Sequence, residues 1–425
     1  MNLSSFLKEN FKFVFLIAYV FVELIRYGGS IDFNQFLFYY ISIVNTITGI
    51  YIILNKEYYL FRLNTLLNNK FFYLYISFLI WGALSYFYAI NTSEVLIKSS
   101  MWITSFIVFL NCYLLYDKND FKKISYILIF LLSLEVYSSF SAYWEITKFQ
   151  PYSFNFNDEI RGVTGNRNLT SLIFCLKIPF VIYLYNTSSK KYFKLFLSLL
   201  LVITTYVLIL LSSRSSYVYY LAMVIISALY SIVFYRKSLF KILKNQYLIY
   251  SFFIAFFFYT IFVGIDNDSS IGNRISSINL EETSTSQRIR FYSHGVNHLK
   301  NNLIFGVGLG NWKIKSIDYD SQNMSSYIVP YYLHNDFLEA GAELGIIGLF
   351  LYLGMFIYLL IMLFVNILKR TNHLERLPYY ILFLSIVVYF IDSNLNFPHG
   401  RAISQTTINI FFALVLIKLT ENEKK

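Results

Sequence analysis

The sequence predicts an all-α integral membrane protein with about twelve transmembrane helices. Hydrophobic residues make up 57% of the 425 residues, and charged residues only 14%. Stretches of roughly 20 apolar residues, the length that a helix needs to cross about 30 Å of hydrocarbon, recur along the chain between short polar breaks. A soluble core cannot bury so much apolar surface. Strands of a membrane barrel are excluded, because these stretches lack a period of two and are about twice too long.

The predicted spans follow one another along a single polytopic domain that we expect to comprise residues 1–425. They are residues 11–27, 36–54, 71–90, 95–116, 122–144, 169–186, 193–212, 216–235, 247–265, 345–367, 378–392 and 404–420. Lys8 and Lys12 precede the first span, and no small-residue cleavage site follows it. We therefore predict a retained helix and not a signal peptide.

Basic residues gather in alternate breaks, which predicts the orientation of the chain. The rich breaks are "NKEYYLFRLNTLLNNK", "DKNDFKK", "TSSKKYFK", "RKSLFKILKNQ" and "KRTNHLERL". Because short loops rich in Lys and Arg stay in the cytoplasm, both termini are predicted to be cytoplasmic. The net charge of +11 follows from this topology, and we expect the lipid bilayer and no nucleic acid as a partner.

The same orientation places three long stretches on the outer face, at residues 145–168, 266–344 and 393–401. The longest, residues 266–344, lies between the ninth and tenth predicted spans. It contains "SQRIRFYSHGVNHLKNNLIFGVGLGNW", in which apolar residues at helical spacing precede a glycine-rich turn. We therefore expect a long extracytoplasmic loop with short helices of its own, and long loops of this kind are usually functional.

Arginine is conspicuous among the outer residues, whereas lysine dominates the inner breaks. The outer arginines are Arg161, Arg167, Arg214, Arg274, Arg288, Arg290 and Arg401. A planar guanidinium can bind a phosphate through two nitrogens and keeps its charge when partly desolvated, so the cluster predicts a bound diphosphate. Arg214 lies in "LLSSRSSYVYY", a turn of a few residues near the membrane boundary; it either binds the diphosphate or reaches lipid headgroups.

The stretch "HNDFLEAGAELGIIG" (334–348) enters the tenth predicted span. Asn335 or Asp336 can cap this helix, and carboxylates in a first turn complement its dipole. One stripe of the helix is expected to contain His334, Leu338, Gly341 and Gly345. Gly341, Gly345 and Gly348 would let a neighbouring helix approach closely. We therefore predict a rigid segment that holds His334 at the bilayer surface.

This stretch is similar to the signature of the O-antigen ligase and polymerase superfamily, which reads His, then Asn, Ser or Gln, nine residues, Gly, two residues and Gly. Here these positions are His334, Asn335, Gly345 and Gly348. The fragments "RGVTGNRN", "SSRSS", "STSQRIRFY" and "FGVGLGNW" agree with the family in their order and in the side of the membrane on which they lie. The resemblance covers most of the chain.

The resemblance implies transfer of a glycan from undecaprenyl diphosphate on the outer, periplasmic face of the bacterial cytoplasmic (inner) membrane. The acceptor is a lipid A core sugar in ligases, a second lipid-linked repeat in O-antigen or capsule polymerases, and a protein hydroxyl in some relatives. The ligases require neither a nucleotide sugar nor a metal, so no cofactor and no metal are expected. We expect a metal-independent, inverting glycosyltransferase of the ligase type, with a polymerase or a protein O-oligosaccharyltransferase as the alternatives.

The chemistry of this transfer suggests roles for the outer residues. Arg214 and Arg288 would stabilise the leaving diphosphate, and His334 would accept the proton of the acceptor hydroxyl or bind the diphosphate as a cation. The expected substrate-binding residues are Arg161, Asn168, Arg290, Asn335 and Arg401. His399, in "FPHGR", either contacts the acceptor or belongs to a tight turn.

A flippase for lipid-linked glycans is the alternative from a different class of protein, because it also has about twelve spans and outer basic residues. It should show related halves and charges along a central cavity, whereas these charges gather at one surface. Two further charges, Glu135 and Lys177, fall inside predicted spans, where an unpaired charge is costly. They are expected either to pair with each other or to face a polar cavity.

Overall fold

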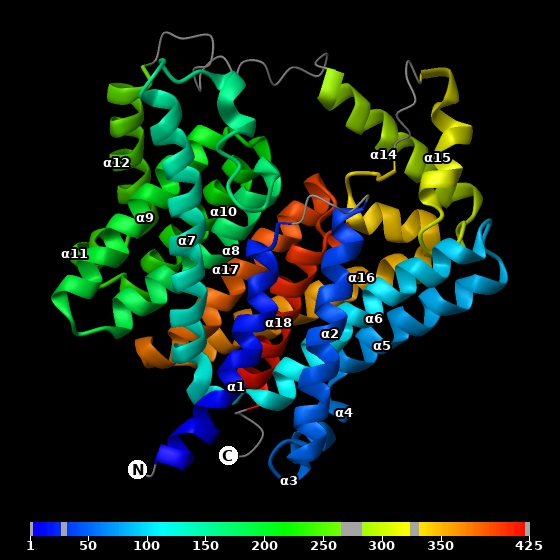
Figure 1. The fold of residues 1–425 in the computed structure, drawn as a ribbon, viewed down its shortest axis with the longest axis horizontal. Coiled ribbons are helices and arrows are strands. Elements are labelled where there is room, and N and C mark those ends of the chain that lie inside the picture. The colour runs from blue at the N-terminus through cyan, green and yellow to red at the C-terminus, as the bar shows by residue number, and fades with distance from the viewer. Residues whose placement is uncertain (1–2, 27–31, 265–282, 324–330, 421–425) are drawn as a thin grey trace.

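The computed structural model describes residues 3–26, 32–264, 283–323 and 331–420. Within these ranges every regular element is helical and no strand occurs. Ten of the described helices are long and apolar enough to cross a membrane. The helices pack side by side in one bundle, as Figure 1 shows. The predicted all-α membrane fold is therefore confirmed.

The ten helices agree with ten of the predicted spans. They are α2 (Phe33–Leu54), α5 (Lys70–Leu84, extended by a 3-10 turn to Phe87), α6 (Thr92–Leu115), α7 (Phe121–Thr147), α8 (Arg167–Thr187), α9 (Lys191–Leu211), α10 (Arg214–Tyr235), α16 (Asp336–Lys369), α17 (His373–Leu395) and α18 (Ala402–Leu419). The first and ninth predicted spans correspond to α1 (Leu3–Phe21) and α12 (Tyr247–Phe262). Helix α1 carries Lys8, Glu9 and Lys12, and α12 has only 16 residues, so neither meets the same standard of length and apolarity.

Shorter helices occupy the breaks. They are α3 (Lys56–Tyr59), α4 (Phe61–Leu67), α11 (Leu239–Lys244), α14 (Thr283–Asn301) and α15 (Trp312–Asp320). Helices α14 and α15 lie within the predicted outer loop, and the glycine-rich turn connects them.

The bundle has two distinct ends. Helix α1 begins and α18 ends at the lower end in Figure 1, which we call the terminal end, whereas α14 and α15 lie at the upper end, which we call the loop end. At the terminal end Lys418 Nζ donates to the Lys118 carbonyl (3.0 Å), and the Tyr235 hydroxyl hydrogen-bonds His373 (2.8 Å). Basic breaks from distant parts of the sequence therefore share this end.

The loop end gathers the breaks with few lysines. Arg26 Nε donates to the Val163 carbonyl (3.2 Å), and Asn34 Nδ2 donates to the Gly400 carbonyl (2.7 Å). Successive breaks thus alternate between the two ends, as a chain that crosses a bilayer back and forth requires.

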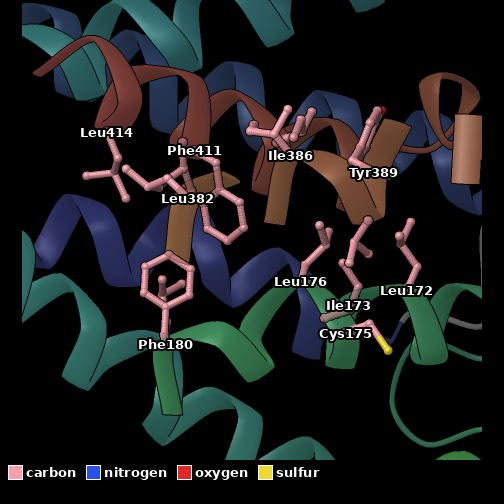
Figure 2. Packing of buried hydrophobic residues seen from close by; sticks show 14 of the residues in the cluster. Leu172, Ile173, Cys175, Leu176, Phe180, Leu382, Ile386, Tyr389, Phe411 and Leu414 are labelled. Atoms are coloured by element: carbon pink, nitrogen blue, oxygen red, sulfur yellow. The ribbon is translucent and has the colours of Figure 1, made fainter. Parts of the chain in front are cut away.

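Helices α8, α17 and α18 form the centre of the bundle. Figure 2 shows Phe180 and Leu176 of α8 facing apolar side chains of α17 and α18. The rings of Phe180 and Phe411 lie 5.1 Å apart, and Ser385 Oγ donates to the Leu176 carbonyl (2.9 Å). Every residue of α18 is buried, including its polar residues Ser404, Gln405, Thr406, Thr407, Asn409 and Lys418, which places this helix inside the bundle.

Lys177 of α8 is fully buried in this core and forms an ion pair with Glu135 of α7 (2.9 Å). It also contacts Glu23, which accepts a hydrogen bond from Thr407 (3.0 Å). Of the two alternatives for these buried charges, the structure shows the ion pair. The pair joins α7, α8, α18 and the turn after α1.

The prediction of one continuous glycine stripe along 334–348 was wrong. His334 precedes the helix with φ of 57°, and α16 consists of two helical parts that meet at Gly345, where φ is 68°. Ile346 N donates to the Leu303 carbonyl (2.7 Å), and a Cβ at Gly345 would collide with the Ile304 carbonyl. The glycine therefore admits the backbone that follows α14, and not a neighbouring membrane helix.

We predict that Gly345→Ala destabilises the protein, because the new Cβ meets the Ile304 carbonyl and the backbone lies in the left-handed region. The expected loss is at least about 2 kcal/mol, seen as a lower midpoint of thermal unfolding by circular dichroism in detergent. Gly49→Ala in α2 is the matched control, since nothing lies within 4 Å of its Cβ position. Equal midpoints for the two variants would contradict this account of Gly345.

Candidate active site

His334 lies at the loop end, held by α14 and by the turn between α17 and α18. The Tyr292 hydroxyl is placed 3.0 Å from the His334 carbonyl and 3.1 Å from the Asn394 carbonyl, so it can donate to either. The imidazole stacks on Phe291 (6.4 Å between centroids, 11° between planes) and meets the Phe397 ring edge-on (5.0 Å). Nδ1 is buried and has no hydrogen-bond partner among the described residues. The aromatic rings thus orient the imidazole and leave one nitrogen available.

Two guanidinium groups act on this imidazole. Arg288 lies one helical turn before Tyr292, on the face of α14 that covers His334. Arg401 lies over the other face of the site, 4.6 Å from the centroid of Phe397. The pKa of His334 is lowered to about 4, chiefly by burial; the charges of Arg288 and Arg401 act in the same direction, and the charge of Glu339 opposes them. The imidazole is therefore neutral at pH 7 and able to accept a proton, and its role in the reaction stays a prediction.

Asn335 fixes the start of α16 immediately after His334. Its Oδ1 accepts from the Leu338 backbone nitrogen (3.0 Å), which makes it the N-cap of the helix. Asn335 is thereby placed beside His334, and its predicted contact with the substrate stays a prediction.

A buried bridge centred on His399 supports the site and was not predicted. His399 Nδ1 contacts Asp336 Oδ1, and Nε2 lies 3.1 Å from Glu339 Oε1. The other oxygen of Glu339 accepts from the Leu333 backbone nitrogen (2.9 Å). Although burial alone would lower the pKa of His399, the Asp336 carboxylate raises it to about 9, and Glu339 also contributes. The bridge ties both flanks of His334 to the turn that carries Phe397.

Sequence patterns left the role of His399 open and assigned Asp336 to the helix start. A signal for the bridge was present, since two carboxylates at i and i+3 of one helical turn share a face, and an outer histidine can serve as their partner. Distance in sequence concealed it, because residues 336 and 399 are brought together only by the tertiary fold.

Arg214 and Asn168 form a second group. Arg214 is the first residue of α10, and the preceding Ser213 donates through Oγ to Asn168 Oδ1 (2.9 Å). Arg214 lines a largely apolar pocket of about 570 Å³ formed by α9, α10 and α12. Nearby, Tyr219 of α10 is close enough to Asp392 for their charges to interact.

Asp392, near the end of α17, connects the two groups. Its carboxyl group interacts electrostatically with Tyr219 and also with Arg288, Arg401 and Asp336. The structure therefore places His334, Arg288 and Arg401 in one group. Asp392, near the end of α17, lies between that group and the Arg214 group and interacts with residues of both sides.

Two further predicted residues, Arg290 and Arg161, have other surroundings. Arg290 is bound to Asp320 through two nitrogens (2.7 and 3.1 Å), and Arg161 is exposed in the turn before α8. Arg274 lies outside the described residues. Their contacts with substrate stay predictions. Among the described residues no group of three or more His, Cys, Asp or Glu side chains is arranged to hold a metal ion.

We predict that His399 makes protein stability depend on pH. A folded-state pKa of about 9, above the ordinary 6.5, contributes stability that is complete below pH 6.5 and is lost as the pH rises through 9. In His399→Gln the thermal midpoint in detergent should be lower at pH 6 and should decline less from pH 6 to pH 10. His294→Gln in α14 is the control. A parallel decline in wild type and His399→Gln would contradict the bridge.

We predict that His334 titrates far below ordinary histidines, with a midpoint of about 4 in the free protein. NMR of ¹³C-labelled histidine in detergent measures the titration, and His334→Gln assigns the resonance. Added pyrophosphate should shift the midpoint upward, because its negative charge offsets the nearby guanidinium groups. A midpoint near 6.5 without pyrophosphate would contradict a buried, neutral imidazole.

Comparison with known proteins gives one match, to a family model. No curated protein matches the chain. Residues 199–353 match the family model described as O-antigen ligase, a region that runs from α9 into α16 and contains Arg214, Arg288 and His334. Over residues 199–353 the chain is therefore similar to the O-antigen ligase family.

Proposed function

We propose that the protein transfers a glycan from a polyprenyl diphosphate, of the undecaprenyl type, to a hydroxyl group of an acceptor glycan. The observation that carries this proposal is His334, whose buried imidazole has a free nitrogen and lies beside Arg288 and Arg401. A neutral base next to fixed cations suits a reaction in which a hydroxyl loses a proton while a diphosphate departs.

The donor is suited to the side of the site formed by α9, α10 and α12. The apolar pocket there can receive part of a polyprenyl chain, and Arg214 at its lining can bind the diphosphate. Arg288, on α14, would meet the same diphosphate from the side of His334. Guanidinium groups in a site shielded from water stabilise the charge that develops on the leaving group.

In the reaction, His334 accepts the proton of the acceptor hydroxyl as its oxygen attacks the anomeric carbon. The bond between that carbon and the diphosphate oxygen breaks, and the diphosphate keeps the electron pair. The attack comes from the side opposite the leaving group, so the anomeric configuration is inverted without a covalent glycosyl-enzyme. The negative charge of the bound diphosphate raises the pKa of His334 toward neutrality, where a base is most effective.

The membrane orientation follows from the charges at the two ends of the bundle. Lysines gather in the breaks of the terminal end, and arginines of the site lie at the loop end. We assign the terminal end to the cytoplasm and the loop end to the periplasmic face of a bacterial inner membrane.

The acceptor is assigned to the lipid A core, which makes the protein an O-antigen ligase; polymerisation of lipid-linked repeats is the second candidate and uses the same chemistry. The test is to incubate the purified protein and a defined undecaprenyl-diphosphate glycan separately with lipid A core, a second lipid-linked repeat and a peptide. We expect a glycosidic product with lipid A core. Product only with the second repeat, or only with the peptide, would overturn the ligase assignment in favour of a polymerase or a protein transferase, and translocation without product would indicate a flippase.

Single variants test the site within the same assay. His334→Ala, Arg288→Ala and Arg214→Ala should each reduce the transfer rate by at least about 100-fold, because each removes the base or a cation at the leaving group. Arg236→Ala is the matched control, since this exposed arginine lies at the terminal end. Wild-type rates in the three site variants would remove the assignment of the site.

A further inference from the structure

A second pocket opens at the loop end, on the side of the bundle away from Arg214. It has a volume of about 390 Å³, within the usual range of roughly 300–1,000 Å³ for small-molecule sites. Its walls come from the start of α2, from α6, from the start of α15 and from the first part of α16. Figure 1 shows α2 and α6 on one side of α18 and α8 and α10 on the other.

The pocket contains a buried ammonium group. Lys98 of α6 is only 8% exposed, yet no ion pair or hydrogen bond joins its Nζ to a described residue. The centroid of the Tyr332 ring lies 5.6 Å from Nζ, and the charges of Glu339, Glu343 and Asp336 act on it from α16. A buried ammonium that lacks direct acceptors is costly unless a ligand supplies them.

The surrounding acceptors are held in fixed positions by the backbone. Glu343 Oε1 accepts from the Trp312 backbone nitrogen (3.1 Å), and Glu339 Oε2 accepts from the Leu333 nitrogen (2.9 Å). Lys313 is already paired with Glu94 (2.6 Å). Lys98 therefore faces two oriented carboxylates, an arrangement that suits hydroxyl groups, which accept from the ammonium and donate to the carboxylates.

Two aromatic rings line the pocket, and one of them is connected to His334 through a neighbouring ring. Tyr331, which is 58% exposed, and Tyr332 both line it and can cover the apolar face of a sugar ring. The ring of Tyr332 stacks on Phe397 (4.2 Å, 4°), and Phe397 in turn contacts the imidazole of His334 (5.0 Å). One aromatic ring thus separates the pocket from the candidate base.

We propose that this pocket binds an uncharged sugar ring of the acceptor, next to the sugar whose hydroxyl faces His334. This inference rests on the proposed glycosyl transfer and adds the class of acceptor that the site selects. An acidic sugar is disfavoured, because the four carboxylates that line the pocket outnumber its two ammonium groups; the carboxylates are those of Asp32, Glu94, Glu339 and Glu343, and the ammonium groups those of Lys98 and Lys313. The position across the bundle from Arg214 leaves the opposite side to the diphosphate of the donor.

Binding of free monosaccharides tests the pocket without requiring transfer. Saturation-transfer difference NMR on the full-length protein in detergent uses glucose, galactose and glucuronate as probes. We expect signals with glucose or galactose and none with glucuronate. Lys98→Met and Tyr331→Ala should each weaken hexose binding by about tenfold, because one removes the charged donor and the other the stacking surface. His334→Ala should retain hexose binding.

Controls separate a local effect from misfolding. Lys148→Met and Tyr192→Ala change exposed residues outside the pocket and should bind hexose as wild type does. Tyr331 is at the surface, so its variant serves even where Lys98→Met fails to fold. Hexose binding that is unchanged in Tyr331→Ala and in folded Lys98→Met, preference for glucuronate, or absence of hexose binding to wild type would overturn the proposal. Hexose binding without any transfer product would instead support the pocket and refute the glycosyl transfer.

Discussion

The loop end depends on one buried electrostatic balance, in which the His399 imidazolium lies between the Asp336 and Glu339 carboxylates. Each carboxylate would be costly to bury alone, and a lone imidazolium equally so. Lys98 adds a second cation and Glu343 a third carboxylate, and these groups lie buried where α6, the first part of α16 and the turn before α18 meet. The residues of the candidate active site lie on either side of these charged groups. Their positions are therefore determined by side chains that need not touch the substrate.

The same principle operates at the centre of the bundle with a different result. Lys177 pairs with Glu135 and contacts Glu23, and all three side chains are fully enclosed by helices. These charges join neighbouring helices and have no access to a ligand. The loop-end set differs in that it borders a pocket, and Lys98 lacks the direct partners that Lys177 possesses. Incomplete pairing at a pocket, and not charge by itself, distinguishes a binding site from a structural ion pair.

Hydropathy predicted most of the membrane helices, because apolar length is a local property of the sequence and directly reports the cost of crossing a bilayer. The choice of His334 and Arg288 as site residues came from the sidedness of basic residues and the family signature, and stays a prediction. Local patterns could not reveal the break at Gly345, because it accommodates the Leu303–Ile304 backbone, which arrives from a separate part of the chain. The partnership of Asp336 with His399 was hidden for the same reason.

An inverting displacement requires the attacking oxygen and the leaving oxygen to lie on opposite sides of the anomeric carbon. Two separate pockets suit this requirement: an apolar one between α9, α10 and α12 that is lined by Arg214, and a polar one at the loop end that is lined by Lys98. In the proposed transfer, the acceptor hydroxyl would reach His334 from the polar side, next to Phe397. Its neutral state in the free protein keeps the base available before the donor binds, and the arriving diphosphate strengthens that base by offsetting the charge of Arg288. Donor binding would then prepare the site for the acceptor through electrostatics alone, with no change in the fold.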